Sequence, residues 1–231
     1  MLTSPWLVHL RTLTRKLGLN KLVGRLIAGS RYEDRFGPAV RREVRPGDTV
    51  WDIGANLGLY TVEFLQQVGP SGQVVAFEPV AACFAQLRER LADSAQVKLK
   101  NMAVGDTDGQ ISMSLEVDPL AATHRVVESG AGGGGAIVQV EVRSSASIVA
   151  EEPELFPNVV KIDVEGHEGA VMDGMQSLLP DRRLRCVGIE VHFGLLDERG
   201  ESARPKQIEQ TLARHGFQVR WTDPSHLLAV R

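Results

Sequence analysis

Residues 50–61 read V-W-D-I-G-A-N-L-G-L-Y-T, and the expected fold follows from this stretch. It comes after Pro46-Gly47-Asp48, which is a turn signal, and it opens with a short apolar run that is typical of a buried strand. Two glycines then lead into an apolar segment that indicates a helix. The stretch therefore predicts a strand, a tight turn and a helix N-terminus, where free backbone N–H groups favour a negatively charged part of a ligand.

The spacing of the two glycines separates two kinds of nucleotide site. Dinucleotide sites carry G-x-G-x-x-G, whereas Gly54 and Gly58 form G-x-x-x-G, with the acid Asp52 two residues ahead of the first glycine. An acid at this turn repels a pyrophosphate but suits a ligand with an ammonium group. S-adenosylmethionine (SAM) carries an amino group and a sulfonium cation, so the pattern favours SAM over NAD.

Length and charge predict one main domain with a basic N-terminal appendage. The chain has 231 residues, enough for one well-packed domain. Residues 1–45 hold ten Lys and Arg against three Asp and Glu, and their apolar residues recur at helical spacing. We expect a basic amphipathic helical segment over 1–45, docked on a main domain over 46–231. Contact of this segment with an anionic surface stays open.

Several classes of partner and location are disfavoured by the sequence. Cys83 and Cys186 stand far apart without metal-type spacing, which indicates buried thiols in a reduced, cytoplasmic setting. No apolar run approaches membrane-spanning length, and the N-terminus lacks a signal-peptide pattern. The main domain has no basic stripe with interleaved aromatics, so we do not expect a nucleic-acid partner. A homo-oligomer stays open.

Alternating strands and helices predict an α/β fold with a mainly parallel sheet, helices on both faces and a C-terminal hairpin. Two further β-type runs, 109–117 and 136–142, flank a glycine cluster at 130–135 that we expect to be a mobile hairpin tip, a substrate-facing loop or a plain linker. The strands are expected at 49–53, 73–77, 97–102, 158–163, 185–190, 217–221 and 227–230. Helices are expected to end near 68, 93, 179 and 215.

Acidic residues stand at the ends of four expected strands: Asp52, Glu78, Asp163 and Glu190. In a parallel sheet the carboxyl ends of the strands share one edge, and ligands bind there. Glu78 lies 20 residues after Gly58, which is about the separation at which an acid meets an adenosine ribose in βαβ nucleotide folds. The sequence therefore predicts a ligand site along this edge.

Four motifs, taken in order, resemble the FkbM-type SAM-dependent methyltransferases. They are V-W-D-I-G-A-N-L-G-L-Y-T, A-F-E-P from residue 76, N-M-A-V-G-D from residue 101 and V-K-I-D-V-E-G-H-E from residue 160. The resemblance runs from about residue 48 to 193 and leaves 1–45 uncovered. It implies a seven-stranded class I methyltransferase (Rossmann-like) fold, SAM as methyl donor, and O-methylation of a hydroxyl on a small molecule such as a bacterial secondary metabolite or a saccharide.

The same resemblance implies roles for individual residues. The SAM loop would be formed by Asp52, Gly54, Asn56 and Gly58, with Tyr60 beside it. Glu78 would bind the ribose, with Pro79 next to it, and Ala103 and Val104 would line the adenine. Asp163 would lie near the methionine part of SAM and its methyl group. One departure concerns the substrate side. The family usually shows a Leu-Asp pair ahead of the fourth strand, and here Ala146 stands about where the Asp would fall.

The expected catalytic residues are Asp163, Glu190 and His192, which follow the fourth and fifth strands. A hydroxyl acceptor benefits from a base or a metal. A neutral imidazole at His192 could take a proton at pH 7, and the oxygens of Asp163 and Glu190 suit Mg²⁺, so metal dependence stays open. Two other functions stay open as well. One is an NAD(P)-dependent oxidoreductase, although the G-x-G-x-x-G motif of such enzymes is absent from residues 50–61. The other is a catalytically silent SAM-binding module.

Overall fold

A seven-stranded sheet forms the centre of the protein. The computed structural model describes residues 35–115, 125–126 and 136–231. The strand order is β10-β11-β9-β8-β1-β2-β3, in which neighbours from β3 to β9 are parallel and β11 is antiparallel to both β9 and β10. The strands are β1 (Thr49–Ile53), β2 (Gln73–Phe77), β3 (Val97–Lys100), β8 (Val159–Ile162), β9 (Cys186–Glu190), β10 (Gln218–Trp221) and β11 (His226–Val230).

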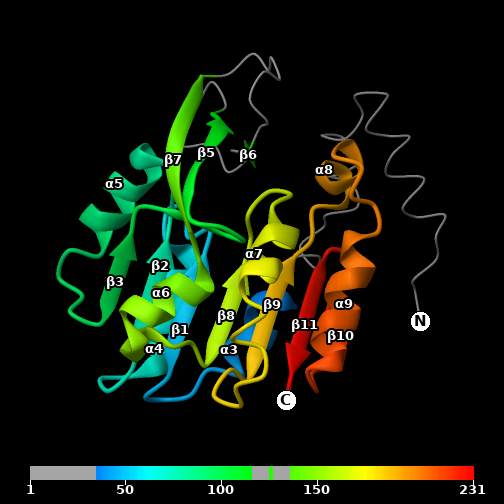
Figure 1. Cartoon of the computed structure of the whole chain (residues 1–231). Helices are drawn as coiled ribbons and strands as arrows, with labels where there is room; N and C mark the ends of the chain where they lie inside the picture. Colours follow the sequence, from blue (N-terminus) through cyan, green and yellow to red (C-terminus); the bar gives the residue numbers. More distant parts are fainter. Residues whose placement is uncertain (1–34, 116–124, 127–135) are drawn as a thin grey trace, which may run out of the picture.

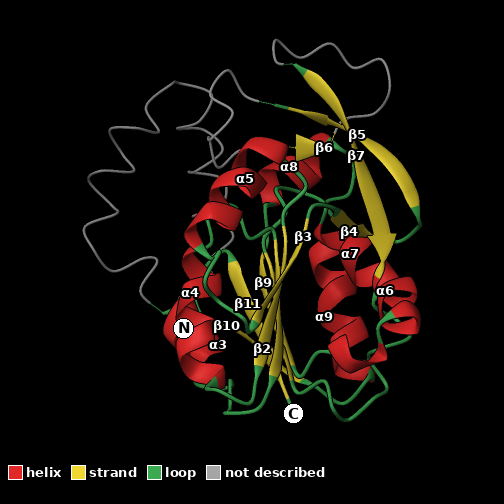
Figure 2. Cartoon of the chain, turned by 90° about the vertical axis from the view of Figure 1, so that its left-hand side faces the viewer, coloured by secondary structure: helices red, strands yellow, loops and turns green. Residues whose placement is uncertain are grey.

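Helices cover both faces of this sheet (Figure 2). One face is covered by α3 (Phe36–Arg41), α4 (Leu59–Val68) and α5 (Ala81–Arg90), and the other by α6 (Ser145–Glu151), α7 (Glu168–Gly174) and α9 (Arg204–Arg214). The short 3-10 helix η1 (Pro153–Leu155) follows α6, and α8 (Phe193–Glu198) follows β9. The expected α/β class, with a mainly parallel seven-stranded sheet, helices on both faces and a C-terminal hairpin, is confirmed.

Side-chain alternation along β1 builds two hydrophobic cores. Trp51 and Ile53 pack into the core beneath α7 and α9, whereas Val50 packs with Phe36 and Phe64 into the core beneath α3 and α4. Successive residues of a strand point to opposite faces, so the fourth residue of β1, Asp52, also points toward α4. This orientation decides what the carboxylate of Asp52 can contact.

A second, four-stranded sheet rises beyond the carboxyl-terminal edge of the central sheet (Figure 1). Its order is β4-β7-β5-β6, where β5 and β7 are antiparallel and β4 is parallel to β7. Residues 103–105 form a short strand because their backbone pairs with β7. The strands are β4 (Ala103–Gly105), β5 (Gly109–Ser114), β6 (Arg125–Val126) and β7 (Ile137–Ser144).

Two helices were not expected from the sequence, and one is shorter than expected. Helix α6 begins after Ser144, whose hydroxyl accepts the N–H of Ser147 at 3.2 Å and so caps the N-terminus of the helix. Ala146, where the sequence departs from the family pattern, lies in the first turn of this helix. Helix α8 is the second. Helix α7 was expected to reach residue 179 but ends at Gly174.

Some expectations concern residues that the structure does not describe. Residues 1–34 of the expected amphipathic segment and the glycine cluster at 130–135 lie outside the described ranges, and the boundary at residue 45 stays a prediction. Both cysteines, Cys83 and Cys186, are buried as expected. None of the helices in the described ranges is long and apolar enough to cross a membrane.

Candidate functional site

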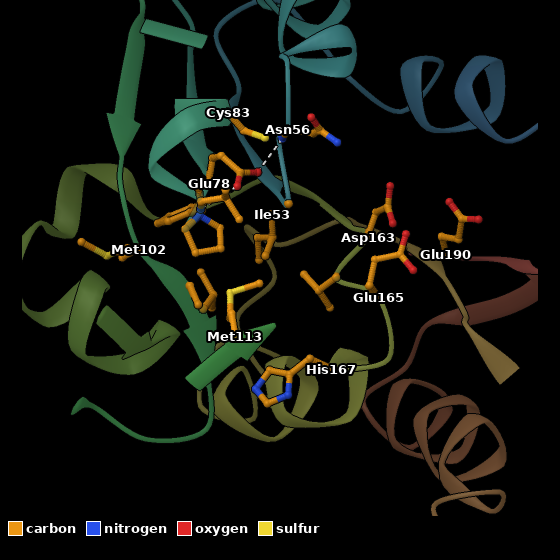
Figure 3. A pocket seen from close by; sticks show the side chains of 17 residues that line it. Ile53, Asn56, Glu78, Cys83, Met102, Met113, Asp163, Glu165, His167 and Glu190 are labelled. Atoms are coloured by element: carbon orange, nitrogen blue, oxygen red, sulfur yellow. Dashed lines mark hydrogen bonds between the residues drawn. The ribbon is translucent and has the colours of Figure 1, made fainter. Parts of the chain in front are cut away.

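A cavity of about 280 Å³ lies along the carboxyl-terminal edge of the central sheet (Figure 3). We call one part its apolar end, lined by Met102, Ala103, Val104 and Met113, and another its acidic end, lined by Asp163, Glu165 and Glu190. Of the residues expected from the sequence, those lining the cavity are Gly54, Asn56, Glu78, Pro79, Ala103, Val104, Asp163 and Glu190. Those that do not line it are Asp52, Gly58, Tyr60 and His192.

The turn between β1 and α4 depends on residues in the left-handed backbone region. Gly54 has φ of 76°, Asn56 of 49° and Gly58 of 78°. A Cβ on Gly54 would stand 1.8 Å from the carbonyl oxygen of Asp163, and one on Gly58 would stand 2.4 Å from Leu87. The first glycine therefore lets the turn after β1 approach the turn after β8, and the second lets α4 pack against α5.

The side chain of Asp52 is buried and paired inside the protein. Its Oδ1 lies 3.0 Å from Nζ of Lys161, and its Oδ2 accepts a hydrogen bond from the Thr61 hydroxyl at 2.6 Å. The expected contact between this carboxylate and an ammonium group of a ligand does not fit the structure, because alternation along β1 turns the side chain toward α4. Asp52 instead supports the turn that a ligand would meet.

Lys161 connects the turn to the acidic end of the cavity. It is buried, donates a hydrogen bond to the carbonyl oxygen of Gly54 at 2.9 Å, and lies 3.7 Å from Asp163. Its Nζ also lies 5.1 Å from the ring centroid of Tyr60. The ring of Tyr60 therefore packs against Lys161 next to the site and does not line the cavity. No feature of the sequence had indicated a role for Lys161.

Glu78 presents a buried carboxylate where β2 ends. Its Oε2 accepts the N–H of Asn56 and its Oε1 accepts the N–H of Val80, each at 2.8 Å (Figure 3). Burial raises the pKa of Glu78 to about 7, and the two backbone donors only partly oppose that rise. Each oxygen keeps a lone pair for a further donor, so this carboxylate can accept hydrogen bonds from a diol.

Asn56 contributes an unfilled acceptor to the same region. Its Oδ1 is buried and has no hydrogen-bond partner among the described residues, and the residue lines the cavity. Buried polar atoms are nearly always hydrogen-bonded in native proteins. A ligand that donates a hydrogen bond at this position would satisfy the atom.

Four carboxylates surround His192 behind the acidic end. Nδ1 of the ring lies 2.6 Å from Glu168, and Nε2 lies 3.3 Å from Glu165, 3.8 Å from Asp163 and 3.9 Å from Glu190. Glu168 is fully buried and also accepts the N–H of Gly166 at 2.9 Å. The sequence pointed to Glu190 and His192 as neighbours, but not to Glu168 as the residue that orients the ring.

The expected neutral imidazole at His192 does not fit these surroundings. Burial by itself would lower the pKa of the ring, but hydrogen bonds to Glu165 and Glu168 and the charges of both outweigh it and raise the pKa to about 11. In this arrangement the ring is a cation at pH 7. The catalytic assignment of His192 stays a prediction, and the starting state of the ring differs from the one expected.

His226 is a further contributor that was not expected from the sequence. Its Nε2 lies 3.3 Å from Oε2 of Glu190, its Nδ1 lies 2.7 Å from Asp223, and its ring packs on Phe36. Burial by itself would lower the pKa of His226, but hydrogen bonds to Asp223 and Glu190 outweigh it and raise the pKa to about 9. His226 therefore holds Glu190 from the side away from His192. No motif marks it, because its position depends on β11 pairing with β9.

Comparison with known proteins identifies a family. The sequence profile of the "Methyltransferase FkbM domain" matches residues 52–219. Hexuronic acid methyltransferase AglP of Haloferax volcanii is 31% identical over 155 residues, which cover 66% of this chain and 59% of AglP. The 31-O-demethyl-FK506 methyltransferase FkbM of Streptomyces tacrolimicus is 29% identical over 206 residues, which cover 77% of this chain and 75% of that protein.

A solved structure shares the fold. The crystal structure of methyltransferase FkbM from Methylobacillus flagellatus matches with a TM-score of 0.52 at 15% identity, over 84% of this chain and 50% of that one. At this level of identity the likeness concerns the fold alone. The chain thus spans about three fifths of AglP and half of the solved FkbM chain.

Proposed function

Because the chain belongs to the FkbM methyltransferase family, we propose that it is a SAM-dependent methyltransferase that methylates a hydroxyl group of a small molecule. The observation that carries the proposal is the cavity, which runs from Glu78 and the apolar end to the acidic end. Glu78 offers a carboxylate for the ribose hydroxyls, and the apolar end offers a surface for adenine. The acidic end offers negative charge for the sulfonium and amino groups. All three lie along the same edge of the sheet.

The chemistry of the cofactor leaves a small number of tasks to the protein. SAM supplies an activated methyl group on its sulfonium when it is bound. For transfer to a hydroxyl, the residues of the chain would hold the acceptor oxygen in line with the sulfur–methyl bond and take up the proton that the hydroxyl loses. The carboxylates of Asp163 and Glu190 are our candidates for receiving that proton. His192 is our candidate for orienting the acceptor hydroxyl.

Relatives suggest which acceptors to try first. The names of two relatives refer to a hexuronic acid and to 31-O-demethyl-FK506, and both compounds carry hydroxyl groups. A test panel should therefore contain a hexuronic acid glycoside, neutral saccharides and hydroxylated natural products.

Calorimetry with S-adenosylhomocysteine (SAH) and with NADH tests the proposal. We expect SAH to bind at micromolar concentration and NADH not to bind, with methyl transfer to at least one hydroxyl compound. Binding of NADH instead of SAH would favour an oxidoreductase. Tight binding of SAH without turnover on the whole panel would favour a SAM-binding module that lacks activity.

SAH binding is expected to release a proton near pH 7 through Glu78. Without a ligand, burial raises the pKa of this carboxyl to about 7. Ribose hydroxyls that donate to the carboxylate favour its charged form and lower its pKa, so SAH affinity should increase as the pH rises to about 7 and then level off. Calorimetry in two buffers with different ionisation enthalpies measures the released proton.

The Glu78→Gln variant is the control for this prediction. The variant should bind SAH more weakly and without that proton release, and equal release in both proteins would exclude Glu78 as the source.

The free energy of unfolding of the ligand-free protein should depend on pH in the opposite direction to SAH affinity, and decrease as the pH rises. Between pH 4.5, the ordinary pKa of a glutamate side chain, and about pH 7, the folded state keeps a proton on Glu78 that the unfolded state has lost. The contribution of Glu78 to stability is therefore present below pH 4.5 and is lost as the pH rises to 7.

A further inference from the structure

We propose that Asp163, Glu165 and His192 form a binding site for a divalent transition-metal ion at the acidic end of the cavity. One ligand atom from each side chain lies within 4.8 Å of the other two. Nε2 of His192 is 3.3 Å from Glu165 and 3.8 Å from Asp163. Neighbouring ligand atoms of an ion bound at about 2.0–2.2 Å lie about 3 Å apart, so small side-chain rotations reach that spacing.

Glu168 orients the histidine as an outer partner of a metal ligand does. Metal-binding histidines commonly donate their second ring N–H to a carboxylate, which fixes the tautomer and the plane of the ring. Here Nδ1 lies 2.6 Å from Oε1 of Glu168, a fully buried side chain held by the N–H of Gly166. The other ring nitrogen, Nε2, is left facing Glu165 and Asp163. The other oxygen of Glu168, Oε2, is buried without a partner among the described residues.

The ligand set differs from the one expected from the sequence. Glu190 is drawn away by His226, whose Nε2 lies 3.3 Å from its Oε2, and its Oε1 lies 3.9 Å from Nε2 of His192. Glu165 takes its place. This residue has φ of 48°, a left-handed conformation that is uncommon outside glycine, and its side chain lines the cavity.

The mixed donor set indicates the kind of ion. Carboxylates suit Mg²⁺ and Mn²⁺, whereas an imidazole suits transition metals, so two carboxylates with one imidazole favour an ion such as Mn²⁺ over Mg²⁺. The side chains of Asp163 and Glu165 are 30% and 21% exposed, which leaves room for a further ligand. This inference rests on the proposed function, in which the ion would supply Lewis acidity to the acceptor hydroxyl.

The alternative is that the imidazole ring itself is the counter-charge of the carboxylates and that no metal binds. The two cases differ in a direct measurement. The whole 231-residue chain is treated with EDTA, and Mn²⁺ is titrated in while the electron paramagnetic resonance signal of free Mn²⁺ is recorded. The proposal predicts one bound Mn²⁺ per chain at micromolar concentration, both with and without SAH.

Variants locate the bound ion. Glu165→Gln and His192→Asn should each weaken Mn²⁺ binding by more than the roughly 10-fold to 100-fold that loss of an outer partner costs. Glu89→Gln removes the same charge from an exposed position on α5 and should leave Mn²⁺ binding unchanged. Thermal melting and SAH calorimetry on each variant establish that it is folded.

The outcomes separate this inference from the proposed function. If SAH binds the EDTA-treated protein but no Mn²⁺ binds below millimolar concentration, the metal site is refuted and the methyltransferase proposal stands. Mn²⁺ binding that survives both Glu165→Gln and His192→Asn also refutes the site. If SAH does not bind to the wild-type protein with or without Mn²⁺, the proposed function fails, and Mn²⁺ binding still reports on the site by itself.

Discussion

Replacing Lys161 with methionine should lower the free energy of unfolding by about 3–5 kcal/mol, because the change leaves the buried carboxylate of Asp52 without its partner. Lys161 and Asp52 are 2% and 0% exposed, and their charged atoms lie 3.0 Å apart. For a chain of this length the melting temperature should fall by roughly 10 °C. Chemical denaturation and thermal melting of the purified protein measure both quantities.

The cause of this loss is charge, and a second substitution tests that. Burial by itself would lower the pKa of Lys161, but the charges of Asp52 and Asp163 outweigh it and hold the pKa above its ordinary value. The double variant Asp52→Asn/Lys161→Met removes both charges and should recover a large part of the stability. Lys98→Met, at an exposed position on β3, is the matched control and should have little effect. A double variant as unstable as Lys161→Met would contradict the explanation by charge.

Gly54→Ala should reduce SAH affinity by about 100-fold, on the order of the loss of rate that a displacement of about 1 Å causes in a catalytic site. The new Cβ would stand 1.8 Å from the carbonyl oxygen of Asp163 and 2.9 Å from its carbonyl carbon. Two backbone segments must then separate, the turn after β1 and the turn after β8, and these carry Asn56 and Asp163. Calorimetry with SAH measures the loss.

Gly200→Ala provides the control for backbone strain. Gly200 has φ of 73°, close to the 76° of Gly54, but a Cβ there meets no atom within 4 Å. The left-handed conformation alone costs an alanine roughly 1–2 kcal/mol, so this variant should be slightly less stable and bind SAH normally. If Gly54→Ala behaved in the same way, close approach of the two turns would not be what the glycine provides.

The sequence predicted the sheet and the edge of the site because both depend on local patterns. Glu78 and Asp163 each follow the last residue of a strand, Phe77 and Ile162, and both line the cavity. Asp52 was assigned to the same group, but it precedes the last residue of β1 and therefore faces α4. A one-residue difference in position along the strand changes the face on which the side chain lies.

Other parts of the site depend on contacts that are distant in the sequence. Lys161 was identified only as part of a motif, and its role follows from the pairing of β8 with β1, which places it beside Asp52. The raised pKa of His192 could not be anticipated from the sequence either, because it requires Glu165 and Glu168 to lie on opposite sides of the ring. Local spacing gives no information about such contacts.

The position of His226 has a consequence for the order of folding. It lies on β11, which enters the sheet between β9 and β10 although it comes last of the three along the chain. β10 pairs only with β11 among the described strands, so it cannot join the sheet earlier. During synthesis the contact that holds Glu190 is therefore incomplete until residue 226 has been added. A nascent chain that already has the turn after β1 still lacks this support at the acidic end of the cavity.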